Sequence, residues 1–124
     1  MLIKKLEDLM IYQIAVELRD EVYEEVHRIP FYWKNDDVRQ IKRSSSSVAS
    51  NIAEGFGRRF YKKDFALFLS YAIGSCEETP NHAFSLHKSG HITLERAEYF
   101  KRKYKDLYIR TIKFRNYQLK PQVA

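Results

Sequence analysis

Apolar residues recur every three or four positions in four separate segments, which is the spacing of one face of an α-helix. In the first segment these positions are Ile11, Ala15, Leu18, Val22 and Val26. Acidic side chains occupy most of the positions between them, so the segment predicts an amphipathic helix. We expect Asp8 to cap its start, since aspartate is a favoured N-cap residue, and Pro30 to mark its end.

The second segment contains four consecutive serines at positions 44–47, yet its apolar spacing is unbroken. The stripe consists of Val38, Ile41, Ser45, Val48, Ile52 and Phe56. The serine run is therefore predicted to be helical, with Asp36 or Asp37 as the N-cap, and its small side chains would let another helix approach closely. Gly55 and Gly57 follow the helix rather than precede one. They are expected to form a left-handed C-terminus, not a phosphate-binding loop.

The third segment, residues 62–89, predicts a helix that contains a proline. Its stripe consists of Phe65, Leu69, Ala72, Cys76, Ala83 and Leu86. Gly90 is expected to stop this helix. Pro80 lies inside it and lacks a backbone donor, so the pattern predicts a kink or a break at that point.

The fourth segment predicts a helix that begins after Thr93, an expected N-cap, and ends near Tyr117. Its stripe consists of Ala97, Phe100, Tyr104, Leu107, Thr111 and Phe114. Residues 118–124 are expected to form a disordered tail. The aromatic linker "FYWKN" at residues 31–35 is expected to fold back onto the end of the bundle or to meet a neighbouring subunit.

Four amphipathic segments with short connections, and no strand-like alternation, indicate an all-α protein. The predicted architecture is an antiparallel up-down-up-down four-helix bundle over residues 1–117. The chain has 124 residues, of which 44% are hydrophobic, enough to bury one core. Its single cysteine suits a reducing compartment, and we find neither a signal peptide nor an apolar run long enough to span a membrane. We therefore expect a cytoplasmic protein.

The net charge of +6 is unevenly distributed along the chain. Residues 1–38 carry nine acidic and five basic side chains, whereas residues 39–63 carry one acidic and seven basic. Residues 64–94 are again slightly acidic, and residues 95–124 carry nine basic side chains against three acidic. This patchwork favours two interpretations equally: binding to nucleic acid, or self-association of acidic faces with basic ones.

Two blocks of sequence, "IKRSSSSVASNIAEGFGRR" and "FALFLSYAIGSCEE", carry a family resemblance. They resemble the bacterial four-helix-bundle proteins encoded by intervening sequences within 23S ribosomal RNA genes. The matching residues are Ser47, Asn51, Ile52, Ala53, Glu54, Gly55, Gly57, Arg58 and Arg59 in the first block, and Phe68, Leu69, Ala72, Gly74, Ser75 and Glu78 in the second. Two residues depart from the pattern: Ala49 stands where the family has proline, and Pro80 stands at a position where members carry a helix-compatible residue.

The resemblance implies an all-α bundle that assembles into a ring, typically a homopentamer. It also implies a relationship in fold to the accessory variability determinant proteins of diversity-generating retroelements, which bind nucleic acid and work with a reverse transcriptase. The partners it suggests are therefore further copies of the chain, nucleic acid, and a reverse transcriptase or ribosome-associated protein.

The polar residues within the matching blocks admit a catalytic and a structural interpretation. Ser47, Asn51 and Glu54 share one face of the second predicted helix, and Glu54 could act as a general base. No nucleophile, second acid or metal set accompanies it, so we favour a polar network between helices or subunits. The structural motif then consists of Ser47, Asn51, Glu54, Gly55, Gly57 and Glu78. His82, His87 and His91 form no recognisable metal motif, and we predict neither an enzyme nor a cofactor.

The basic clusters are the more informative candidates for function. We predict that nucleic acid is bound by Arg43, Arg58, Arg59, Lys62, Lys63, Lys101, Arg102, Lys103 and Lys105, because phosphate contacts require only exposed positive charge. No helix-turn-helix, zinc-finger or RNA-recognition signature indicates base-specific readout. The alternative is a protein-interaction scaffold for a polymerase or a ribosome-associated factor, which the aromatic linker and the acidic first helix favour.

Overall fold

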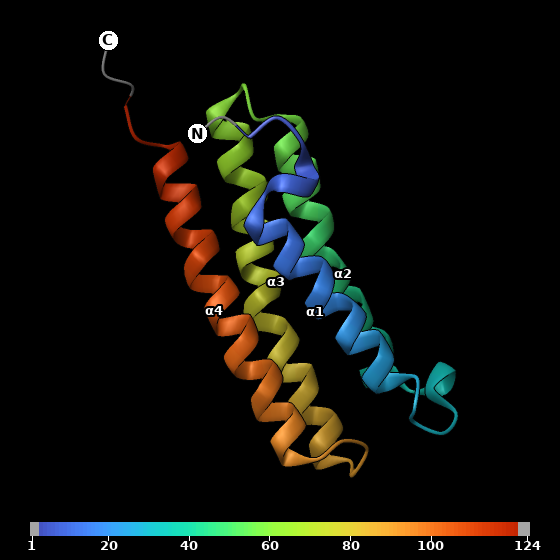
Figure 1. The fold of residues 1–124 in the computed structure, drawn as a ribbon. Coiled ribbons are helices and arrows are strands. Elements are labelled where there is room, and N and C mark those ends of the chain that lie inside the picture. Colours follow the sequence, from blue (N-terminus) through green and yellow to red (C-terminus); the bar gives the residue numbers. More distant parts are fainter. Residues whose placement is uncertain (1–2, 122–124) are drawn as a thin grey trace.

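The structure, a computed structural model that describes residues 3–121, consists of helices joined by short connections (Figure 1). The elements are η1 (Leu6–Asp8), α1 (Met10–Val26), η2 (Tyr32–Lys34), α2 (Asp36–Gly57), α3 (Lys62–Lys88) and α4 (Leu94–Gln118). No β-strand occurs within the described residues. The prediction of an all-α protein with four long helices is confirmed.

Successive long helices run in opposite directions and lie side by side (Figure 1). The most extensive packing joins α3 to α2 on one side and to α4 on the other, and α1 packs mainly against α2. The contact between α1 and α4 is smaller and is reinforced by polar side chains. The guanidinium of Arg96 lies 2.7 Å from the carboxylate of Glu25, and the Tyr99 hydroxyl donates to Glu21 at 2.6 Å.

All four predicted apolar stripes face the core. Every member is buried except Phe114, which is half-buried and packs against the core cluster. Burial of the α2 stripe extends to Ser44 and Ala49 beside the predicted positions. The serine run is helical, as predicted, and both Ser44 and Ser45 are fully buried. Small polar residues therefore form part of the surface that α2 presents to its neighbours.

The helix caps agree with the sequence in one case and differ in two. Thr93 caps α4, since its hydroxyl accepts a hydrogen bond from the backbone N–H of Arg96 at 3.1 Å. The prediction for Asp8 is wrong: this residue ends η1, and α1 begins after Leu9. The cap of α2 is Asn35, whose side-chain oxygen accepts from the N–H of Val38 at 3.1 Å. Asp36 and Asp37 instead occupy the first turn of α2, where negative charge favours the helix dipole.

The glycines of the "GFG" segment do not form a turn, and only Gly55 is closely packed against another helix. Both lie within α2 and neither has a positive φ, so the predicted left-handed C-terminus is wrong there. A Cβ atom on Gly55 would lie only 3.0 Å from Cδ1 of Phe65, which indicates that α3 packs directly on this backbone. The left-handed glycine is Gly90, with φ of 79°, after the end of α3.

Pro80 does not break α3, which continues through it to Lys88.

The residues of the aromatic linker differ in their contacts. Tyr32 stacks on His27 with ring centroids 4.3 Å apart, whereas Phe31 and Trp33 are 64% and 59% exposed. At the other end of the chain, α4 includes Gln118. Residues 122–124 of the predicted tail lie outside the described residues.

Candidate nucleic-acid interface

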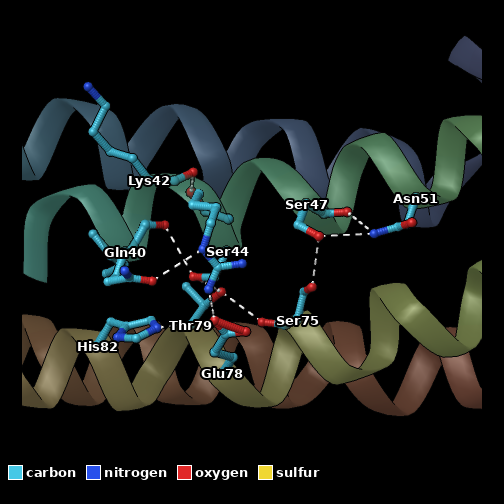
Figure 2. A network of polar contacts seen from close by, with 12 residues as sticks. Gln40, Lys42, Ser44, Ser47, Asn51, Ser75, Glu78, Thr79 and His82 are labelled. Carbon is cyan, nitrogen blue, oxygen red and sulfur yellow. Dashed lines mark hydrogen bonds and ion pairs between the residues drawn. The ribbon is translucent and has the colours of Figure 1, made fainter.

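A polar network joins α2 to α3 through the serine run (Figure 2). The hydroxyl of Ser75 donates to that of Ser47 at 3.0 Å, and the Asn51 amide donates to the same Ser47 hydroxyl at 2.9 Å. One turn away, the hydroxyl oxygens of Thr79 and Ser44 lie 2.9 Å apart. Because these short side chains bond to one another across the interface, they let the two helices approach while satisfying their polar atoms.

The two glutamates of the predicted motif are not part of one cluster. Glu54 is exposed, and its nearest cationic partner is Arg58 at 3.9 Å. Glu78 forms an ion pair with Arg43 and lies 3.3 Å from Nε2 of His82. Partial burial opposes ionisation of Glu78, but hydrogen bonds from His82 and Arg43 outweigh it and lower the pKa of this carboxyl. The Arg43–Glu78 contact crosslinks α2 and α3.

The predicted basic residues at the α2–α3 corner are partly engaged. Arg58 lies between the carboxylates of Glu54 and Asp64, at 3.9 and 3.8 Å. Arg59 lies over the rings of Phe56 and Phe60, with its guanidinium carbon 4.2 and 4.7 Å from the ring centroids.

Two exposed lysines complete this corner. The ammonium group of Lys62 donates to the side chain of Gln118 at 3.0 Å, and so ties the corner to the end of α4. Lys63 is exposed and forms no ion pair in the structure of residues 3–121. The corner is therefore positively charged but partly neutralised by its own carboxylates.

The basic residues of α4 are organised differently. Lys101, Arg102, Lys103 and Lys105 are all exposed. None of the nine ion pairs found within residues 3–121 includes any of them. We call these four residues the α4 basic patch. It lies along the first half of α4, away from the α2–α3 corner, which meets the end of that helix (Figure 1).

Beside this patch lies a groove between α3 and α4 that sequence reasoning missed. We call it the α3–α4 groove; it has a volume of about 470 Å³ and is lined by Cys76, Glu77, Pro80, Asn81, Phe84, Lys101, Tyr104, Lys105 and Tyr108. The groove residues recur every three or four positions on both helices, and this spacing is the only sign of a shared face that the sequence contains. The polar members alternate with the predicted core stripes and resemble ordinary solvent-facing positions.

The histidines make local contacts and do not converge. Nε2 of His82 lies against Glu78, and Nδ1 of His87 lies 3.1 Å from the carbonyl oxygen of Ile92. Within residues 3–121, no three His, Cys, Asp or Glu side chains are placed to share a metal ion. Cys76 is buried in the core, as its position in the stripe predicts.

None of the helices described here is long and apolar enough to cross a membrane.

The family model of the 23S rRNA-intervening sequence protein matches residues 7–112, which include all four long helices except the last turns of α4. The chain belongs to this family. The resemblance carried by the "NIAEGFGRR" block is thereby confirmed at the level of the family.

A solved structure supports the fold independently. A protein of unknown function from the S23 ribosomal protein family of Bacteroides thetaiotaomicron VPI-5482 superposes with a TM-score of 0.78 at 20% sequence identity. The match covers 90% of this chain and 99% of the other. A search of curated proteins found no significant match. At this identity the likeness establishes the shared fold and does not extend to function.

Proposed function

We propose that this protein is a non-enzymatic, ring-forming helical bundle that binds nucleic acid through sequence-independent charge. The observation that carries the proposal is the α4 basic patch, in which four exposed cations lie within five residues and have no carboxylate partner among residues 3–121. Side chains with no internal partner can neutralise phosphates without first breaking an ion pair. Such contacts supply most of the affinity in non-specific nucleic-acid binding.

We rank the nine predicted basic residues by the ion pairs that they form. Arg43 and Arg58 lie against carboxylates, so we assign them a smaller part in binding. The α4 basic patch forms the principal contact, and the exposed Lys62 and Lys63 at the α2–α3 corner form a secondary one. A strand bound to both surfaces would run along the bundle from the first half of α4 toward its end.

Assembly into a ring, for which we propose a homopentamer, would repeat the patch around one axis. Several weak contacts to one RNA or RNA–DNA molecule would then combine into a strong one. The resemblance to ring-forming relatives and to the accessory variability determinant proteins supports this part of the proposal. On the same basis, we propose that a reverse transcriptase or a ribosome-associated protein acts on the nucleic acid that the ring holds.

Charge reversal tests the proposed surface. The triple variant Lys101→Glu, Lys103→Glu, Lys105→Glu is expected to abolish binding to labelled RNA in fluorescence anisotropy while the mass from light scattering stays unchanged. A matched control reverses the exposed lysines Lys4, Lys5 and Lys88, which changes the net charge equally but lies outside the patch. Equal losses in both variants would show that total charge matters and the α4 basic patch does not.

A second candidate, a protein-interaction scaffold, is favoured by the loop between α1 and α2. Phe31 is 64% exposed and has a φ of 55°, a left-handed conformation that is unfavourable for a bulky residue. Trp33 is 59% exposed beside it. Replacing both, as Phe31→Gly and Trp33→Ser, should remove binding to a polymerase or ribosomal partner and leave RNA affinity unchanged. Unchanged partner binding would exclude the loop as the docking surface.

A further inference from the structure

The α3–α4 groove has two chemically different walls and aromatic surfaces between them. Lys101 and Lys105, one turn apart on α4, form the cationic wall. Glu77 and Asn81, one turn apart on α3, form the opposite wall, and both are exposed. With a volume of about 470 Å³, the groove falls within the range of small-ligand sites.

Each lysine of the cationic wall lies over an aromatic ring. The Nζ atom of Lys101 is 5.9 Å from the centroid of the Phe84 ring, and that of Lys105 is 4.8 Å from the Tyr108 centroid. Phe84 and Tyr108 are only half-buried although both pack against the core. The groove thus combines partly exposed rings with two adjacent positive charges, the two groups that single-stranded nucleic acid requires of a binding surface.

The α3 wall supplies hydrogen-bond acceptors. Glu77 offers a carboxylate and Asn81 an amide that can both accept and donate. Pro80 has no N–H to donate to the carbonyl of Cys76, four residues earlier in α3, and both residues line the groove. The helix therefore lacks one backbone hydrogen bond at this wall. A carboxylate repels phosphate, so a bound strand would place its backbone on the lysine wall and its bases toward α3.

We propose that the α3–α4 groove takes one unpaired base of a single strand, and that it favours bases with an exocyclic amino group over uracil. The base stacks against Tyr108 and Phe84, its flanking phosphates contact Lys101 and Lys105, and its amino group donates to Glu77. A duplex is disfavoured because its bases are stacked inside and present no free face. This inference rests on the proposed function and adds the base to the phosphate contacts described there.

The first measurement compares 12-nucleotide oligo(C) with oligo(U), which have the same charge and differ in the pyrimidine edge. Anisotropy at low salt should give about fivefold or more tighter binding to oligo(C), because cytosine donates through N4 and uracil offers O4 instead. The DNA strand oligo(dC) is expected to bind like oligo(C), since none of the proposed contacts involves the 2′-hydroxyl. A 2-aminopurine placed within oligo(C) should lose fluorescence on binding, as its ring stacks on an aromatic side chain.

Two variants test the proposed roles of the groove residues. Glu77→Gln should reduce the oligo(C) to oligo(U) affinity ratio toward one, whereas a purely electrostatic role would raise both affinities by the same factor. Its control is Glu17→Gln on α1, an exposed glutamate without an ion pair among residues 3–121. Tyr108→Leu keeps an apolar side chain but removes the ring, and should weaken oligo(C) binding about fivefold or more and restore the 2-aminopurine signal. Tyr71→Leu, 51% exposed elsewhere on α3, should change neither.

The outcomes separate this inference from the function on which it rests. If neither oligonucleotide binds at low salt, the proposed function fails and the groove proposal falls with it. If both bind with equal affinity, or if Tyr108→Leu has no more effect than Tyr71→Leu, the basic patch binds phosphates and the groove holds no base. Discrimination that Glu77→Gln removes and Glu17→Gln leaves intact would support the groove as the base site.

Discussion

The hydroxyl groups of Thr79 on α3 and Ser44 on α2 lie 2.9 Å apart, and neither side chain is exposed to solvent. Oγ1 of Thr79 also lies 2.8 Å from the carbonyl oxygen of Ser75. The pair belongs to the α2–α3 interface, one turn from the Ser47–Ser75 hydrogen bond (Figure 2). At this point of the α2–α3 interface, small hydroxyl side chains thus stand in place of larger apolar residues.

Thr79→Val should destabilise the protein by about 1–2 kcal/mol, because the variant keeps the shape of the side chain and removes a buried hydrogen-bond partner. Urea denaturation monitored by circular dichroism measures the change. The double variant Ser44→Ala, Thr79→Val should cost less than the sum of the two single variants, since each single variant already breaks the bond between the two hydroxyls. Additive costs would show that the two hydroxyls do not interact in solution.

Substitution of two helical glycines by alanine should have opposite effects. A Cβ on Gly55 would lie 3.0 Å from Cδ1 of Phe65 and 3.1 Å from Cβ of Phe68, so Gly55→Ala must displace these tightly packed atoms of α3 by a few tenths of an ångström. We expect a loss of about 1 kcal/mol or more in the free energy of unfolding. Gly74 lies inside α3, and a Cβ there would meet no neighbouring side chain or helix of residues 3–121 within 4 Å, so Gly74→Ala should gain about 0.5–1 kcal/mol. Equal effects at the two sites would contradict the close packing at Gly55.

Tyr104 carries the only buried side-chain polar atom without a hydrogen-bond partner in the structure of residues 3–121. Burial raises the pKa of its hydroxyl far above the ordinary value, because the charged form cannot be solvated there. Tyr104→Phe removes this unpaired group and keeps the ring, so thermal and urea unfolding should show unchanged or slightly increased stability. A loss above about 1 kcal/mol would mean that the hydroxyl has a partner in solution.

Cys76 should make stability depend on pH in the alkaline range. Burial, followed by the nearby charge of Glu77, raises the pKa of its thiol from 9.0 to about 12. The folded state therefore favours the neutral thiol, and this contribution is fully present below about pH 9 and is lost as pH rises toward about 12. The stability difference between the native protein and Cys76→Ala should shrink between about pH 8 and about pH 10.5. A constant difference over this range would show that the thiol ionises equally well in both states.

The sequence was sufficient for the helices and their buried faces because both follow from local spacing. The stripe from Val38 to Phe56 predicted which side of α2 is buried, and the structure confirms it. The role of Gly55 could not be predicted in the same way. Whether a helical glycine ends a helix or admits a neighbour depends on which residue of another helix faces it, here Phe65.

The candidate site was predictable in composition but not in arrangement. Sequence alone identified the cations of α4 and of the α2–α3 corner with equal weight. Only the fold shows that Arg58 lies against Glu54 and Asp64, while the α4 basic patch forms no ion pair among residues 3–121. The groove beside Lys101 and Lys105 was missed altogether, because it exists only where α3 and α4 lie side by side.

The most direct test of the central claim is the salt dependence of nucleic-acid binding by the native protein. Anisotropy would be measured with single-stranded RNA, duplex DNA and an RNA–DNA hybrid between about 50 and 200 mM salt, with the oligomeric mass determined by light scattering on the same sample. We predict a ring whose affinity falls by about 10³-fold or more over that range, as expected when about six or more phosphates are contacted. Weak binding to all three ligands that does not change with salt would contradict the account.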